Sequence, residues 1–184
     1  MLLFKNKKTA MSVHISFIIL LVLLSLNPLK SSDYETIWGD EKTSFITKYK
    51  SGKYFTFKAK DDPEYKNRII DFFTSMDAND NVDITVVRIN GKPEIDYCFF
   101  NEKLYSISEN WGDIDTKTAA KLIQSIRKNF PGQSTEKKAR DIIYSFKKNK
   151  TKILFQQNIS GTDTVKVKIF YYSTDLFRML FNEQ

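Results

Sequence analysis

Residues 82–172 contain a succession of short segments rich in β-branched and aromatic residues, separated by brief polar turns. Asn90-Gly91 is a strong hairpin signal, and Asn101-Glu102, Asn149 and Ser160-Gly161 mark further turns. Strands joined by such short turns pair antiparallel, because a parallel pair needs a long crossover connection. The expected strands are 82–89, 95–100, 104–108, 142–147, 152–158 and 164–172.

Helical signals lie before and between these strands. Asp40 can cap a short helix over 41–50, which precedes an alternating strand at 53–60. Asp62-Pro63-Glu64 is a strong helix start, and the apolar spacing that follows it predicts a helix to Met76, although a strand at 68–73 is the alternative. Two more helices are expected, one from Asp115 or Thr116 to Phe130 and a short one over 176–181. This order predicts an α+β fold, with antiparallel β-meander sheets and helices packed on one face.

Both tryptophans of the chain occur in the same tripeptide. Trp38-Gly39-Asp40 precedes the first expected helix, and Trp111-Gly112-Asp113 precedes the helix that starts near 115. A glycine there would let the chain turn sharply, and the tryptophan would pack across the helix start. The pattern suggests a tandem αβββ pseudo-repeat with halves 38–110 and 111–184, and chance identity of two short strings is the alternative.

The first 32 residues resemble an export leader in their composition. They contain Lys5, Lys7, Lys8 and Lys30 and no acid, and an apolar stretch over 15–26 follows the first three lysines. A basic flank before a short apolar core is typical of a secretory signal peptide. The stretch is shorter than the roughly 20 residues that span a bilayer. We therefore expect residues 1–32 to be a signal peptide, or alternatively an uncleaved anchor, and residues 33–184 to be one exported α+β domain, periplasmic or secreted.

More than half of the net positive charge of the chain lies in residues 1–32. The full sequence has 29 Lys and Arg against 22 Asp and Glu, a net charge of +7. Four of these cations belong to residues 1–32, which leaves 25 against 22, or +3. The one basic cluster in the remainder is read as the solvated rim of a turn, so no nucleic acid partner is expected. Its members are Lys137, Lys138, Arg140, Lys147, Lys148, Lys150 and Lys152.

Few residue types suited to catalysis remain. The single histidine is His14, inside the leader, so residues 33–184 cannot form a Ser-His-Asp triad or a histidine metal site. Cys98 is expected as a buried thiol, with an intermolecular disulfide as the alternative. No glycine-rich phosphate loop occurs, and no cofactor is expected. An enzyme would have to use carboxylates alone, and the alternative function is therefore a glycan-directed hydrolase. The paired acids available for it are Asp61/Asp62, Asp113/Asp115 and Glu94/Asp96.

One string resembles the start of a calcium loop. Asp77, Asn79, Asn81 and Asp83 alternate as oxygen ligands do in an EF-hand. Val82 occupies the position that needs glycine, and the position of the bidentate glutamate is not an acid. A solvated turn is therefore favoured over a weak calcium site.

Aromatic strand residues give the remaining hypothesis. In a sheet with helices on one side, the rings on the other side would form an exposed platform for a partner, unless the 62–76 and C-terminal helices cover it. The leading prediction is therefore a non-catalytic domain that binds a protein, peptide or envelope component through a sheet face or edge. The candidate contact residues are Phe99, Phe100, Tyr105, Tyr171, Tyr172, Trp38 and Trp111.

Overall fold

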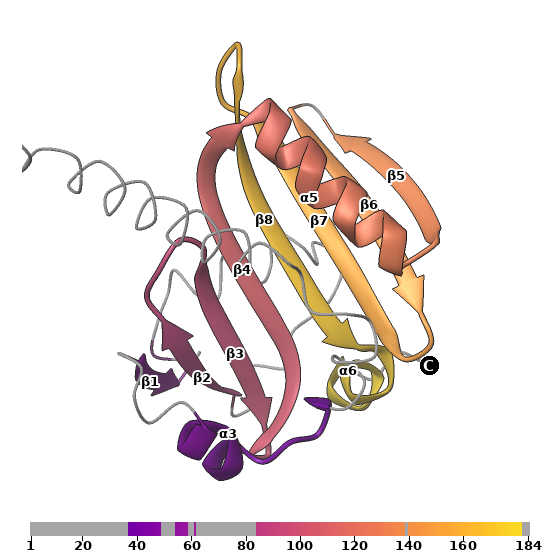
Figure 1. The fold of residues 1–184 in the computed structure, drawn as a ribbon. Coiled ribbons are helices and arrows are strands. Elements are labelled where there is room, and N and C mark those ends of the chain that lie inside the picture. Colours follow the sequence, from indigo (N-terminus) through magenta and orange to yellow (C-terminus); the bar gives the residue numbers. More distant parts are fainter. Residues whose placement is uncertain (1–36, 49–53, 59–60, 62–83, 139, 182–184) are drawn as a thin grey trace, which may run out of the picture.

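The computed structural model describes residues 37–48, 54–58, 61, 84–138 and 140–181, and these form an α+β fold around one antiparallel sheet (Figure 1). The sheet has eight strands in the order β1-β2-β3-β4-β8-β7-β6-β5. The strands are β1 (Tyr54–Lys58), β2 (Ile84–Ile89), β3 (Glu94–Phe100), β4 (Lys103–Asp115), β5 (Gly132–Lys138), β6 (Asp141–Lys148), β7 (Thr151–Ile159) and β8 (Thr164–Ser173). The helices are α3 (Lys42–Lys48), α5 (Thr116–Asn129) and α6 (Thr174–Phe181).

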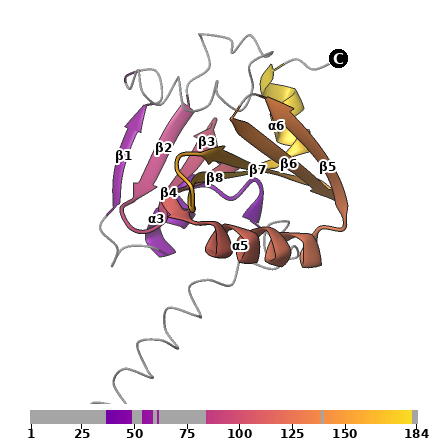
Figure 2. The ribbon, with the colours of Figure 1, turned by 90° about the horizontal axis from the view of Figure 1, so that it is seen from above.

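The strand order divides the sheet into two meanders of four strands. Strands β1 to β4 pair in sequence order, and β5 to β8 do the same. The last strands of the two meanders, β4 and β8, pair antiparallel in the middle of the sheet. As a consequence β1 and β5 lie at opposite ends of the sheet, which curves so that its two ends rise on the same side (Figure 2).

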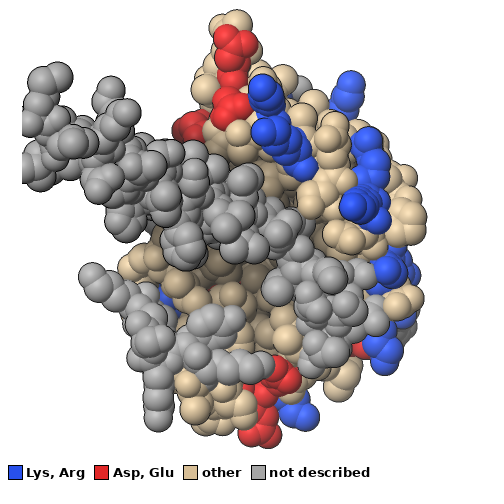
Figure 3. Space-filling model, in the orientation of Figure 1, with Lys and Arg blue, Asp and Glu red and all other residues tan. Residues whose placement is uncertain are grey.

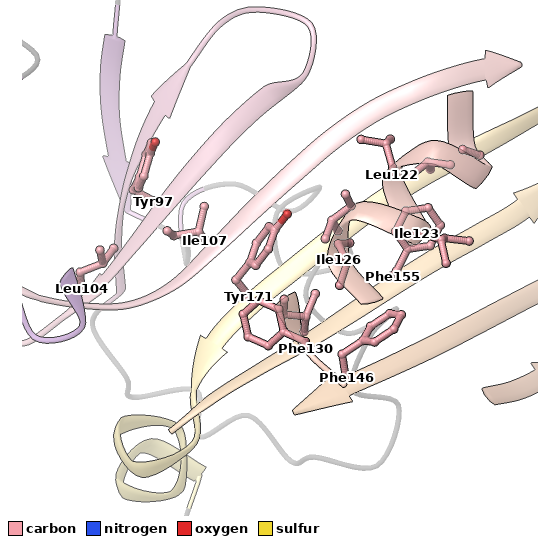
Figure 4. Packing of buried hydrophobic residues seen from close by; sticks show 14 of the residues in the cluster. Tyr97, Leu104, Ile107, Leu122, Ile123, Ile126, Phe130, Phe146, Phe155 and Tyr171 are labelled. Atoms are coloured by element: carbon pink, nitrogen blue, oxygen red, sulfur yellow. The ribbon is translucent and has the colours of Figure 1, made fainter. Parts of the chain in front are cut away.

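Helix α5 is positioned by its cap and by its apolar face. Asp115 precedes the helix, and its Oδ1 accepts a hydrogen bond of 2.8 Å from the backbone N–H of Thr118. This hydrogen bond and one from the Thr118 hydroxyl lower the pKa of Asp115. The buried residues of α5 recur at helical spacing, and Figure 4 shows three of them beside the rings of β7 and β8. The buried residues of α5 are Ala119, Leu122, Ile123 and Ile126.

Apolar clusters cover both faces of the sheet. Helices α3 and α5 contribute Phe45 and Leu122 to the larger cluster, together with Tyr171 of β8. Helix α6 contributes Phe177 to a second cluster, together with Tyr172, whose side chain alternates with that of Tyr171. Figure 2 shows α5 and α6 on opposite sides of the sheet. The expectation that the helices pack on one face is therefore wrong, because α6 packs against the other cluster from α3 and α5.

Two strands differ from the sequence expectation. Strand β4 continues to Asp115, well beyond 104–108, because Trp111 and Gly112 belong to a bulged part of the strand rather than to a loop. Strand β5 was not expected, because its sequence GQSTEKK has no apolar alternation. The leader 1–32 and the expected helix 62–76 lie outside the described residues.

Candidate functional site

Four of the seven predicted contact residues lie in the protein core. Phe99, Tyr105, Tyr171 and Tyr172 are exposed by only 0%, 2%, 1% and 5%. The rings alternate between the two faces, and each face has its own apolar cluster, so both sets are covered. Phe100 is partly buried against the second cluster. The prediction that these rings form an exposed platform is therefore wrong, while binding through the sheet stays a prediction.

The two tryptophans have structural contacts. Trp38 is partly buried and donates from Nε1 to Oγ1 of Thr151, 2.8 Å away, in the other meander. Trp111 is also partly buried and donates from Nε1 to Oε2 of Glu109 at 2.9 Å. Both rings pack against the larger core cluster. The Trp38 hydrogen bond joins distant parts of the fold, whereas the Trp111 hydrogen bond is local to β4. These contacts give both tryptophans a structural role.

Of the cysteine and the calcium-like string singled out from the sequence, the structure describes only the cysteine. Cys98 is a fully buried thiol outside any disulfide, as expected, and this burial rules out an intermolecular disulfide in this conformation. The candidate calcium ligands lie outside the described residues; they are Asp77, Asn79, Asn81 and Asp83. Among the residues that the structure describes, no group of three or more His, Cys, Asp or Glu side chains could hold a metal ion.

Glu109 is an acid whose pKa differs from that of an ordinary surface carboxyl. It lies on β4 opposite Ile169 of β8, at the junction of the two meanders. Burial raises its pKa, and hydrogen bonds from Trp111 and Tyr171 oppose that rise. The raised pKa would suit a general acid. However, the neighbouring side chains are an indole, a phenol and apolar groups, with no second acid for a hydrolytic pair among the contacts described.

The expected Glu94/Asp96 pair is held by an arginine. Both acids lie on one face of β3, because they are two residues apart on a strand. Arg88 of β2 stands directly across from Asp96 in the register and binds it through two hydrogen bonds, Nε to Oδ1 at 2.6 Å and Nη2 to Oδ2 at 2.7 Å. Its Nε is 3.7 Å from Oε1 of Glu94. Both oxygens of Asp96 are thus occupied, which argues against a nucleophile or acid–base role for this pair.

Two phenylalanines of the neighbouring strand stack beside this arginine. Phe55 and Phe57 are two residues apart on β1 and lie on the same face, with ring centroids 5.9 Å apart and an interplanar angle of 28°. The Arg88 guanidinium carbon lies 5.7 Å from the centroid of Phe55 and 5.1 Å from that of Phe57. We call Phe55, Phe57, Arg88, Glu94 and Asp96 the edge cluster.

The edge cluster combines a rigid, buried ion pair with an exposed aromatic ring. Arg88 and Asp96 are exposed by only 8% and 5%, while Phe55 is 43% exposed. The bidentate bonds fix the guanidinium plane, and the guanidinium in turn supports the rings. Sequence reasoning placed Phe55 and Phe57 on one side of a strand but did not connect them with Arg88. The missing information was the β1–β2 register, which sets Phe55 opposite Arg88.

Comparison with known proteins identifies no relative for this chain: no family model, curated protein or solved structure matches it. Among the described residues, no helix is long and apolar enough to cross a membrane.

Proposed function

We propose that the protein is an exported, non-catalytic binding domain that attaches an extended segment of a partner protein or envelope component to strand β1. The observation that carries this proposal is the half-exposed ring of Phe55 on the terminal strand of the sheet, supported from below by an ion-paired arginine. Export rests on the basic and apolar composition of residues 1–32.

The edge cluster has the composition of an interaction hot spot. Aromatic residues and arginine are enriched where binding energy concentrates, because they present a large contact area with few rotatable bonds. Phe55 needs little ordering on binding, since it is already stacked on Phe57. A partner side chain placed over Phe55 would therefore gain contact area at a low entropic cost.

The position of β1 suits addition of a strand. It lies at one end of the strand order, beyond which the described residues provide no further strand. Its sequence, YFTFK, is aromatic and has one charge at its end. Natural proteins usually protect such an edge with charges or proline, because it is a template for pairing with another chain. An extended peptide that paired here would place alternate side chains over the edge cluster.

We also infer that the two meanders descend from one duplicated unit. Each follows a helix, and each ends in a strand that pairs with its counterpart at the centre of the sheet. Gly39 and Gly112 of the two matching tripeptides both have positive φ, at 87° and 63°. The unit would have four strands rather than the expected three, and a boundary at 110/111 would fall inside β4.

The test of the binding proposal is site-specific photocrosslinking followed by affinity measurement. A benzoylphenylalanine at position 55 of the full chain, expressed in its own source cells, should capture a specific polypeptide or envelope component. The matched control position is Ile159, which is 49% exposed at the end of β7.

Two substitutions then measure the contribution of the ring. We expect F55A to weaken binding of the captured partner by about 30-fold, the loss of roughly 2 kcal/mol typical of a hot spot. I159A should leave binding within about twofold, because its exposed side chain lies outside the edge cluster. Equal capture from both positions, or unchanged affinity of F55A, would show that the edge cluster is not the binding site.

A further inference from the structure

The charges of the domain are divided unequally between its two halves. Residues 33–115 have 11 Lys and Arg against 17 Asp and Glu, whereas residues 116–184 have 14 against five. Residues 33–184 therefore have a small net charge overall, although residues 116–184 are strongly basic. This half begins with α5, which contains four basic residues and no acid.

The basic residues of α5 form one exposed stripe. Lys117, Lys121 and Lys128 are exposed and recur at helical spacing, with Arg127 exposed beside them. Lys137 of β5 lies on the same side of the sheet, because its register places it with the strand positions that face α5. In Figure 3, blue side chains follow the course of α5 and continue along the adjacent rim of the molecule. We call these five residues the basic face.

Helix stability accounts for only part of this stripe, because Arg127 and Lys128 lie in the last turn, where cations suit the helix dipole. Lys117 lies in the first turn, where a cation opposes the helix dipole, and the acid at this end of the helix is the capping Asp115. Lys117 and Lys121 are four residues apart, a spacing at which like charges destabilise a helix by roughly 0.2–0.5 kcal/mol. An ordinary solvated helix would alternate its charges. The placement of Lys117 and Lys121 is thus better suited to an anionic partner than to the helix itself.

We infer that the basic face binds the anionic headgroups of a phospholipid bilayer. Helix α5 lies against the sheet and presents only its outer side, which fits a flat partner better than a groove (Figure 2). Its exposed positions include Ala120 and Gln124 but no aromatic ring, so neither base stacking nor deep insertion is supported. The proposal is independent of the edge cluster, which lies on the other meander and the other face of the sheet.

The test is partitioning of the full chain onto vesicles of phosphatidylglycerol mixed with phosphatidylcholine, and onto vesicles of phosphatidylcholine alone. The variant K117Q/K121Q/K128Q removes the stripe and keeps good helix formers. The control K92Q/K103Q/K166Q removes three exposed lysines outside α5, so both proteins have the same net charge and the same residues 1–32.

Each basic side chain at an anionic surface is worth about fivefold in partitioning. We expect the partition coefficient of the α5 variant on the anionic vesicles to fall roughly 10- to 100-fold. That of the control should fall less than about threefold, and neither should change on neutral vesicles. A further variant, Q124K, extends the stripe and should raise partitioning on the anionic vesicles. High salt should remove these differences.

Three results would overturn the inference. The α5 variant could bind anionic vesicles as well as the unmodified protein does, or the two triple variants could lose partitioning equally. Alternatively, the α5 substitutions could weaken binding to a DNA duplex and leave vesicle binding unchanged, which would assign the basic face to nucleic acid.

Discussion

The strands at the two ends of the sheet differ in amino-acid composition. Strand β1 at one end is aromatic and lies over a buried Arg88–Asp96 ion pair. Strand β5 at the other end, GQSTEKK, contains no apolar side chain and has three charges. Charged residues are a common protection of an exposed sheet edge. The difference supports the proposal that a partner strand pairs with β1 rather than with β5.

The largest expected difference between the two meanders is in their cross-strand acids. Asp96 pairs with Arg88 at the first end, and Asp141 accepts a 2.8 Å hydrogen bond from Nδ2 of Asn158 at the other. D96A should cost about 3–5 kcal/mol of unfolding free energy, because it removes both short hydrogen bonds of a buried guanidinium and leaves the longer contact with Glu94.

The matched variant at the other end should be far less sensitive. D141A should cost about 0.5–1.5 kcal/mol, the usual contribution of a hydrogen bond between partly buried groups. Denaturant unfolding of both variants measures the two losses. Equal losses would contradict the view that the first end is held by a buried ion pair.

A medium effect is expected at the two matching tripeptides. Gly39 and Gly112 have φ of 87° and 63°, and a Cβ at either position would meet no atom within 4 Å. Substitution by alanine therefore tests backbone conformation alone. We expect each substitution to lower the free energy of unfolding by roughly 1–2 kcal/mol. G39A should cost more than G112A, because 63° lies within the left-handed region open to other residues and 87° lies outside it.

Thermal or denaturant unfolding of the two glycine variants gives the comparison. If neither substitution lowered stability, the two glycines would not be required by the turns. The duplication hypothesis would then lose the conformational feature that the two tripeptides share.

The smallest expected effect concerns the junction of the meanders. Burial raises the pKa of Glu109 above its ordinary value of 4.5. The folded state then binds this proton more tightly than the unfolded state does, so the contribution of Glu109 to stability falls as pH rises from about 4.5 through the folded pKa.

The variant E109Q isolates this contribution, since its amide oxygen can still accept from Trp111. Stability of the unmodified protein relative to E109Q should decrease between acidic and neutral pH, as followed by unfolding at each pH. Exposed Asp115 should act oppositely, with stability lost as pH falls below its ordinary 3.8, because its pKa is lowered by capping α5. A pH-independent difference between the unmodified protein and E109Q would contradict a raised pKa of Glu109 in the folded state.

The sequence predicted much of the architecture and little of the site. Local signals were sufficient for α5, where Asp115 and the apolar spacing agree, and for the hairpins of β2–β3 and β6–β8. They failed for β5, because an exposed edge strand needs no apolar alternation. The edge cluster could not be predicted, since it depends on cross-strand register. The prediction of an exposed aromatic platform was wrong, because a second apolar cluster covers the face on which Tyr105 and Tyr172 lie.

Hydrogen–deuterium exchange of the full chain, alone and with the partner captured at position 55, tests the binding account most directly. Strand addition at β1 would give its backbone amides new hydrogen-bond partners. The account predicts slower exchange over 54–58 and unchanged exchange over 132–138. Protection at 132–138, or no protection at 54–58, would contradict it.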